Sequence, residues 1–308
     1  MSQGLVDDTA AAAALGLARP VEPGSGPGPG RRVDARRVLR FLARRPGLLL
    51  SVLVLVLVVL ASFWPGLFTS RDPLTGVPSQ NFRGPSGAHW FGTDELGRDV
   101  FSRVVHGAQL SLKATLIAVA VAFVVGSLIG LVAGFVGRWI DDVLMRFVDV
   151  LLSIPALFLS LALVTALGYG TVKVAVAVGI ASVASFARVT RAEVLRVRQA
   201  VFVEASRSCG ARWYSVLGRH VLPNAAGPVI VLATLDFGSS ILAVSALSFL
   251  GYGAPPPAPE WGTLISDGRN YLANAWWLTA LPGLAIAATV LATNRIARAL
   301  DGEWSRQP

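Results

Sequence analysis

Long apolar stretches alternate with short polar or basic segments along most of the chain. The first stretch follows a cluster of arginines, and the later ones are separated by charged residues, glycine or proline. Stretches of this length are typical of helices that cross the hydrocarbon core of a bilayer, which takes about 20 helical residues. The pattern predicts six transmembrane helices, at residues 48–64, 113–136, 147–167, 172–187, 228–250 and 275–292.

Two features within these stretches refine the prediction. Gly126, Gly130 and Gly134 recur every four residues, so the second helix has one smooth face that another helix can approach closely. Pro155 lies within the third helix and predicts a kink, which is common in helices that line a moving pathway. Because backbone groups in lipid must be hydrogen-bonded within the segment, the predicted fold class is an all-α integral membrane protein.

The distribution of basic residues predicts the orientation. Most of the 27 lysines and arginines lie in the N-terminal tail, after the second span, in residues 188–227 and after the last span. Basic segments stay on the cytoplasmic side of a membrane, so both termini and the long loop 188–227 are expected in the cytoplasm. The segment 65–109 is then external, and the protein crosses the membrane several times.

The ends of the chain differ from the membrane domain. Residues 1–32 are rich in alanine, glycine and proline and are expected to form a disordered cytoplasmic tail. Residues 33–45 place apolar side chains on one helix face among arginines, which predicts an interfacial amphipathic helix bound to membrane lipid. The membrane domain is expected to cover 46–300, and 301–308 to form a second cytoplasmic tail.

Composition excludes several functional classes. Hydrophobic residues make up 54% of the chain and charged residues 15%, whereas soluble proteins usually have about 25% charged residues. The net charge of +9 is explained by arginines in cytoplasmic loops, so no nucleic-acid partner is expected. Cys209 is the only cysteine, which excludes an internal disulfide.

No site for catalysis or for a bound cofactor is apparent in the sequence. The only lysines are Lys113 and Lys173, and neither lies in the Gly-Lys-Ser/Thr of a phosphate-binding loop, so an ATPase would be another polypeptide. His89, His106 and His220 are divided between the two predicted sides of the membrane, so no metal site is expected. The chain is therefore expected not to be an enzyme.

The cytoplasmic loop contains the sequence EASRSCGARWYSVLGRHVLP. Its Glu-Ala opening, its central glycine and its Leu-Pro at the end resemble the EAA loop in the membrane subunits of ATP-binding-cassette importers. The resemblance implies two short helices that meet near the glycine and dock into a separate ATPase subunit. Ser206 stands where a second alanine is usual, and both residues are small. The other matching positions are Glu204, Ala205, Gly210, Leu222 and Pro223.

A second stretch, HWFGTDELGRDVFSRVVHGAQLSL, lies in the predicted external segment. Thr93 is expected to be the N-cap of a surface helix whose first turn holds Asp94 and Glu95. The pattern FGTDxxGRD resembles the dipeptide, oligopeptide and nickel branch of these importers, in particular its second permease subunit, similar to DppC and OppC. The residues that carry this likeness are Gly92, Thr93, Asp94, Gly97, Arg98 and Asp99.

The resemblance implies a type I importer permease fold in the plasma (inner) membrane of a bacterium. It also implies a second homologous permease subunit, two cytoplasmic ATPase subunits or domains, and an extracytoplasmic substrate-binding protein. ATP and Mg would be bound by the ATPase subunits, and no cofactor by this chain. The implied function is a permease subunit that forms half of the translocation pathway for di- or oligopeptides, or for a related small solute.

Two other functions fit the sequence less well. A secondary transporter driven by an ion gradient needs acids within the membrane as ion relays, and Asp149 and Asp236 give thin support for it. A purely structural membrane scaffold is the third option. Asp236 either lines a water-filled pathway or forms a structural hydrogen bond to a neighbouring helix. Asp236 and Pro155 are the pathway candidates, although Val244 stands where related proteins often have a glutamate.

Overall fold

The computed structural model describes residues 46–304, and these residues form an assembly of α-helices. Apart from one isolated bridge, the described residues contain no strand, so the predicted all-α fold class is confirmed. The predicted tail 1–32, the interfacial helix 33–45 and the end of the C-terminal tail lie outside the described residues. The helices are α3 (Pro46–Phe63), α4 (Val100–Val136), α5 (Arg138–Ser153), α6 (Ala156–Leu167), α7 (Thr171–Arg198), α8 (Val201–Ser208), α9 (Trp213–Val216), α10 (Leu222–Phe249), α11 (Trp261–Gly268) and α12 (Trp277–Trp304).

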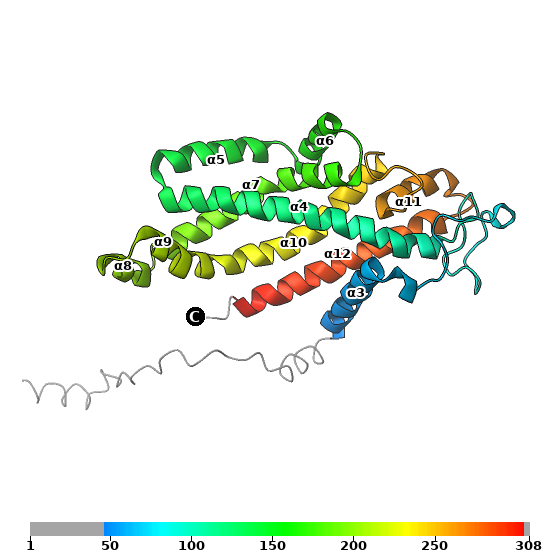
Figure 1. Ribbon diagram of the computed structural model, residues 1–308, viewed down its shortest axis with the longest axis horizontal. Helices are drawn as coiled ribbons and strands as arrows, with labels where there is room; N and C mark the ends of the chain where they lie inside the picture. The colour runs from blue at the N-terminus through cyan, green and yellow to red at the C-terminus, as the bar shows by residue number, and fades with distance from the viewer. Residues whose placement is uncertain (1–45, 305–308) are drawn as a thin grey trace, which may run out of the picture. The chain divides into compact units, whose positions relative to one another are not determined.

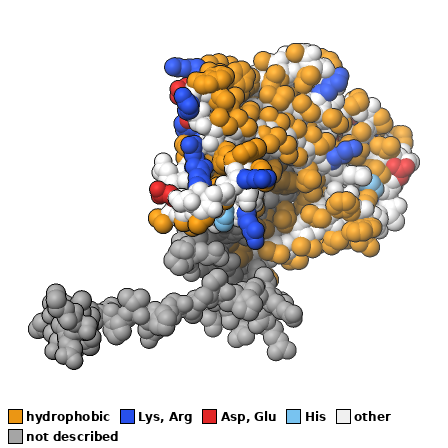
Figure 2. Space-filling model, turned by 60° about the vertical axis from the view of Figure 1, so that its left-hand side comes forward, with side chains coloured by type: hydrophobic (Ala, Val, Ile, Leu, Met, Phe, Trp, Pro, Cys, Tyr) orange, Lys and Arg blue, Asp and Glu red, His pale blue; other side chains and the backbone are white. Residues whose placement is uncertain are grey.

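Four long helices, α4, α7, α10 and α12, run alongside one another (Figure 1). α8 and α9 lie at one end of these helices, and α11 and the segment before α4 lie at the other. Five of the described helices are long and apolar enough to cross a membrane, and α5 with α6 makes a sixth span if the bent pair counts as one. Much of the surface in Figure 2 is apolar, as helices that face lipid or another subunit require.

α4 and α7 touch where α4 has glycines. A Cβ atom added to Gly126 would lie 2.6 Å from the carbonyl oxygen of Val183, and one added to Gly130 would lie 2.3 Å from that of Ala187. Gly134 continues the same contact toward the end of α7. The predicted smooth face is therefore confirmed, since only glycine lets the two backbones approach this closely.

The predicted third span consists of two helices rather than one kinked helix. α5 and α6 meet at 94°, and the break falls at Ile154 and Pro155. Ile154 is extended, with φ −97° and ψ 127°, because a residue before proline is disfavoured in the helical region. Residues 138–146, which lie between the second and third predicted spans, belong to α5. An ion pair holds α5 against α7, with the Arg191 guanidinium donating to both carboxylate oxygens of Asp141.

Several helices extend further than the apolar stretches predict. α4 begins at Val100, inside the predicted external segment 65–109, and its 37 residues span about 55 Å. α7 ends at Arg198 and α10 begins at Leu222, so both enter the predicted loop 188–227. The apolar pattern marks only the part of a helix that lies in lipid. Polar turns at the ends continue the same backbone hydrogen bonds into water.

The contact between α4 and α7 leaves no room for a methyl group at its centre. We expect Gly130→Ala to lower the free energy of unfolding by about 1–3 kcal/mol, because the new Cβ would press on the α7 backbone. Gly283→Ala in α12 is the matched control, since its Cβ would have only Ile265 as a neighbour, at 4.0 Å. The thermal unfolding midpoints of the detergent-solubilised proteins check this. Equal midpoints for the two variants would contradict it.

Candidate functional site

The predicted docking loop folds into two short helices, α8 and α9, beyond the end of α7 (Figure 1). The chain turns between them at Gly210, whose φ of +81° lies in the left-handed region. A Cβ atom on Gly210 would meet nothing within 4 Å, so the turn needs glycine for its backbone angle and not for space. The two helices that the resemblance implies are therefore present, and they meet at the expected residue.

One face of the α8–α9 pair is buried against the ends of the long helices. Val203 of α8 and Val216 of α9 are fully buried. They belong to an apolar cluster with Val194 and Val197 near the end of α7 and with Phe135 near the end of α4. Burying a valine side chain contributes about 1.5–3 kcal/mol. The pair is therefore attached to the ends of α4 and α7 and is expected to move with them.

The pair also carries exposed apolar and aromatic side chains. Val201 is 81% exposed, Trp213 66% and Tyr214 52%. Arg212 lies beside them and donates a hydrogen bond to the Tyr214 hydroxyl (2.9 Å). We refer to the exposed side of residues 201–214 as the α8–α9 surface. Exposed aromatic side chains next to arginine are typical of the centres of protein–protein interfaces.

The residues of the EAA-like motif take different positions around this surface. Ser206 is half-buried, and its Oγ lies 3.4 Å from Nε2 of His220, so the departure from alanine adds a polar contact between α8 and the turn before α10. Pro223 lies in the first turn of α10, where a helix tolerates proline because no N–H donor is needed. The exposed motif residues are Glu204, Ala205, Gly210, Leu222 and Pro223.

The external motif forms a tight turn before α4 rather than the start of a helix. Thr93, predicted to be an N-cap, lies in this turn, and its backbone pairs with that of Asp99. The Asp94 carboxylate accepts hydrogen bonds from the N–H groups of Leu96 (3.0 Å) and Arg98 (2.9 Å) and from the Arg98 guanidinium (2.6 Å). The prediction of a helix at Thr93 is wrong because the Asp94 side chain stabilises a turn instead.

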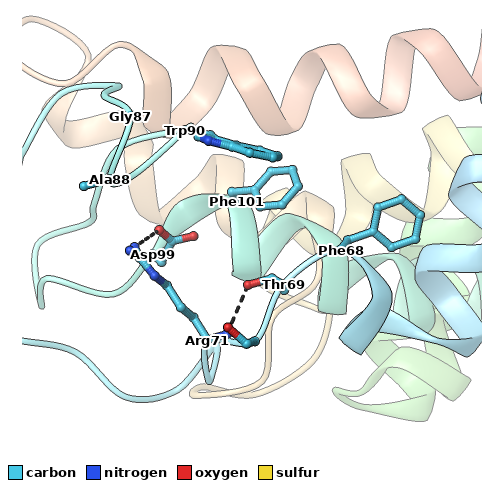
Figure 3. A pocket seen from close by; sticks show the side chains of 9 residues that line it. Phe68, Thr69, Arg71, Gly87, Ala88, Trp90, Asp99 and Phe101 are labelled. Atoms are coloured by element: carbon cyan, nitrogen blue, oxygen red, sulfur yellow. Dashed lines mark hydrogen bonds and ion pairs between the residues drawn. The ribbon is translucent and has the colours of Figure 1, made fainter.

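Asp99 is the N-cap of α4. Its carboxylate accepts hydrogen bonds from the N–H of Ser102 (2.8 Å) and from Nη1 of Arg71 (2.8 Å), the latter drawn in Figure 3. Nδ1 of His89 lies 2.8 Å from the same carboxylate oxygen that Arg71 contacts. These contacts fix the segment after α3 to the start of α4. The exposed Trp90 borders a pocket of about 250 Å³ beside them (Figure 3).

The two motif glycines lie where the turn touches the chain before it. A Cβ atom on Gly97 would lie 2.0 Å from the carbonyl oxygen of Val77, and one on Gly92 would lie 2.6 Å from that of Arg83. Any larger residue at either position would separate the turn from this segment. The motif at residues 92–99 therefore holds together the end of the molecule opposite α8 and α9.

Glu260 is a buried acid that the sequence analysis does not single out. It is 1% exposed, and its carboxylate accepts hydrogen bonds from the N–H of Ala254 (2.7 Å) and the hydroxyl of Ser248 (2.8 Å). The neighbouring Trp261 is also buried, and its indole N–H donates to the carbonyl of Val104 (2.8 Å). Nothing in the local sequence predicts this burial, because glutamate is almost never fully buried unless it is paired.

The acidic residues of the spans form polar contacts between helices. Ser182 of α7 donates a hydrogen bond to Oδ1 of Asp236 in α10 (3.2 Å), which is the structural interpretation of Asp236. That Asp236 or Pro155 lines the pathway stays a prediction. Asp149 pairs with Arg188 (2.6 Å).

The residues that the structure describes contain no cluster of three or more His, Cys, Asp or Glu side chains able to hold a metal ion.

Comparison with known proteins decides the family. Residues 126–306 match the family described as binding-protein-dependent transport system inner membrane component. The chain belongs to this family.

The dipeptide transport system permease protein DppC of Alkalihalophilus pseudofirmus is 38% identical over 85% of this chain and 86% of its own length. The di/tripeptide transport system permease protein DppC of Pseudomonas aeruginosa is 42% identical, with 80% and 83% covered. The glutathione transport system permease protein GsiD of Escherichia coli is 40% identical, with 83% and 84% covered.

Solved structures of importer permeases have the same fold. The permease resembles a chain of the inward-facing methionine transporter MetNI, with a TM-score of 0.50 and 20% identity over 64% of this chain and 95% of that chain. It also resembles a chain of an amino acid ABC transporter crystallised with histidines, with a TM-score of 0.51 and 17% identity over 65% and 94%. The permease is thus a subunit of an ATP-binding-cassette importer and a multi-pass inner membrane protein with the type I fold. The family does not support a secondary transporter.

Asp99 is expected to stabilise the outer end of the permease. Asp99→Ala removes the N-cap of α4 and leaves Arg71 and His89 without their common partner. We expect the free energy of unfolding to fall by about 2 kcal/mol, the upper range for loss of an N-cap. Asp142→Ala on α5 is the control: its carboxylate is exposed, so the free energy of unfolding should change little. Thermal unfolding of the two variants checks this, and an unchanged midpoint for Asp99→Ala would contradict the role of this side chain.

Proposed function

We propose that this permease forms one half of the translocation pathway for di- or oligopeptides, and that its α8–α9 surface couples it to a separate ATPase subunit. Relatives that match most of the chain are permeases for dipeptides, for di- and tripeptides and for glutathione, which is itself a short peptide. The coupling role rests on one observation. The α8–α9 surface is exposed and aromatic on one side and is anchored to the long helices on the other.

The α8–α9 surface has the chemistry of a docking surface. Its aromatic side chains can fill an apolar groove, and loss of such anchors usually costs more binding energy than loss of any other interface residue. Arg207 and Arg212 lie at its edge and are exposed, so they favour a groove with an acidic rim. Glu204, exposed on the first turn of α8, adds one acceptor for a basic residue of the partner.

The part played by this chain in coupling is mechanical. ATP and Mg would be bound by the ATPase subunits, whose closure would move the docked helices. Val203 and Val216 would transmit this motion to the ends of α4 and α7, because a close-packed contact moves as a unit and does not deform continuously. The long helices would then rearrange and open the pathway to the outside.

The complete importer would contain four further components. These are a second homologous permease, two ATPase subunits or domains, and an extracytoplasmic binding protein that delivers the peptide. In this complex the α8–α9 surface and both termini lie in the cytoplasm, as the basic residues of 188–227 favour. The turn at residues 92–99 faces the binding protein at the other end of the long helices.

Gly210→Val should uncouple transport without preventing membrane insertion. A β-branched residue in the left-handed region is strained by about 1–2 kcal/mol, and relief of the strain would change the angle between α8 and α9. We expect peptide uptake by cells to fall at least about tenfold at an unchanged amount of protein in the membrane. Gly66→Val, in the exposed segment after α3, is the control, because its Cβ would also meet nothing within 4 Å and its φ is not left-handed. Normal uptake by the Gly210→Val variant would refute the coupling role.

The exposed Cys209, next to the turn, allows a test of the orientation and of docking. We expect a membrane-impermeant maleimide to leave Cys209 unlabelled in intact cells and to label it in inside-out vesicles stripped of the ATPase. Adding the ATPase back should slow the labelling, since docking covers the α8–α9 surface. A variant that combines Cys209→Ser with Ser79→Cys, in the exposed outer segment, should be labelled in intact cells. Labelling of Cys209 from outside intact cells would overturn the orientation.

A further inference from the structure

An open groove lies where α3 begins and α12 nears its end. Its volume is about 530 Å³, within the range of sites that hold a small ligand. The described residues that line it come from the first turn of α3 and from the last turns of α12, and none of them is acidic. They are Pro46, Gly47, Leu48, Arg295, Arg298 and Ala299.

Among the described lining residues, the positive charge of this groove comes from α12. The Arg295 guanidinium lies directly against Gly47, since a Cβ atom there would be 2.4 Å from Cζ of Arg295. Arg298 lies one turn further along the same helix, and both arginines are exposed. Like charges three or four residues apart on a helix destabilise it, so an anion held between Arg295 and Arg298 is favourable.

The positions one turn deeper into each helix are apolar and exposed. Leu50, one turn after Gly47, is 62% exposed, and Leu291, one turn before Arg295, is 67% exposed. α12 is therefore cationic at the groove and apolar one turn further inside, and α3 presents an apolar surface beside it. This arrangement is complementary to a molecule with an anionic head and a hydrocarbon tail.

We propose that the groove binds the phosphate headgroup of an anionic phospholipid, and that an acyl chain lies along Leu50 and Leu291. The two guanidinium groups donate hydrogen bonds to the phosphate oxygens, and their charge selects an anionic headgroup over a zwitterionic one. The site lies at headgroup depth because Pro46 and Gly47 directly precede the apolar stretch of the first span. It does not depend on the transported solute. Only its place in the inner leaflet follows from the proposed orientation.

The test measures the retention of lipid by the complete importer. The complex is reconstituted in nanodiscs of phosphatidylcholine with a small share of phosphatidylglycerol, extracted gently, and the retained phosphatidylglycerol is counted by native mass spectrometry. Loss of two basic residues should weaken binding roughly tenfold to thirtyfold in a variant with both Arg295→Gln and Arg298→Gln. The matched variant with both arginines changed to lysine should keep the lipid. Arg269→Gln, in the exposed turn after α11, should also keep it.

Two outcomes would overturn the proposal. One is equal retention of phosphatidylglycerol by the glutamine variant and the unchanged protein. The other is displacement of the lipid by millimolar inorganic phosphate, which would make the groove a site for simple anions. If the glutamine variant does not assemble, photoactivatable phosphatidylglycerol can be applied to the unchanged complex. Cross-links to residues 285–304 are then expected, and their absence would equally refute the site.

Discussion

The contact between α4 and α7 is the constraint on which both ends of this permease depend. Gly126, Gly130 and Gly134 bring the two backbones together over three turns. One end of α4 carries the cap at Asp99, and the other end supplies Phe135 to the cluster beneath α8 and α9. One helix pair therefore connects the surface proposed to receive the binding protein with the surface proposed to receive the ATPase. A close-packed pair is suited to this because it transmits displacement with little loss.

Buried carboxylates hold the connecting segments to this frame. Asp99 and Glu260, which are buried, and Asp236, which is half-buried, each accept two or more hydrogen bonds. A carboxylate buried in this way is costly unless its oxygens are satisfied, so each one specifies which segments must meet. The three acids act as structural acceptors, and the work of transport is consistent with movement of helices more than with chemistry at a side chain.

The sequence predicted features that depend on local pattern and missed those decided by distant contacts. The glycine face and the helices around Gly210 follow from residues a few positions apart, and both are present. The start of α4 does not follow from the local sequence, because Thr93 and Asp99 are both good N-cap residues. Asp99 rather than Thr93 caps the helix because Arg71, 28 residues earlier in the chain, donates a hydrogen bond to its carboxylate. Pro155 predicts a kink within one helix, but the extended residue before it ends α5.

The break between α5 and α6 at Pro155 affects how the chain is expected to enter the membrane during synthesis. α6 has 12 residues and is about 18 Å long, too short to cross the hydrocarbon core alone. Only a short turn around Gly168 and Gly170 separates it from α7. We therefore expect α6 to insert as half of a hairpin with α7, once α7 has been synthesised and offers a surface for it to pack against.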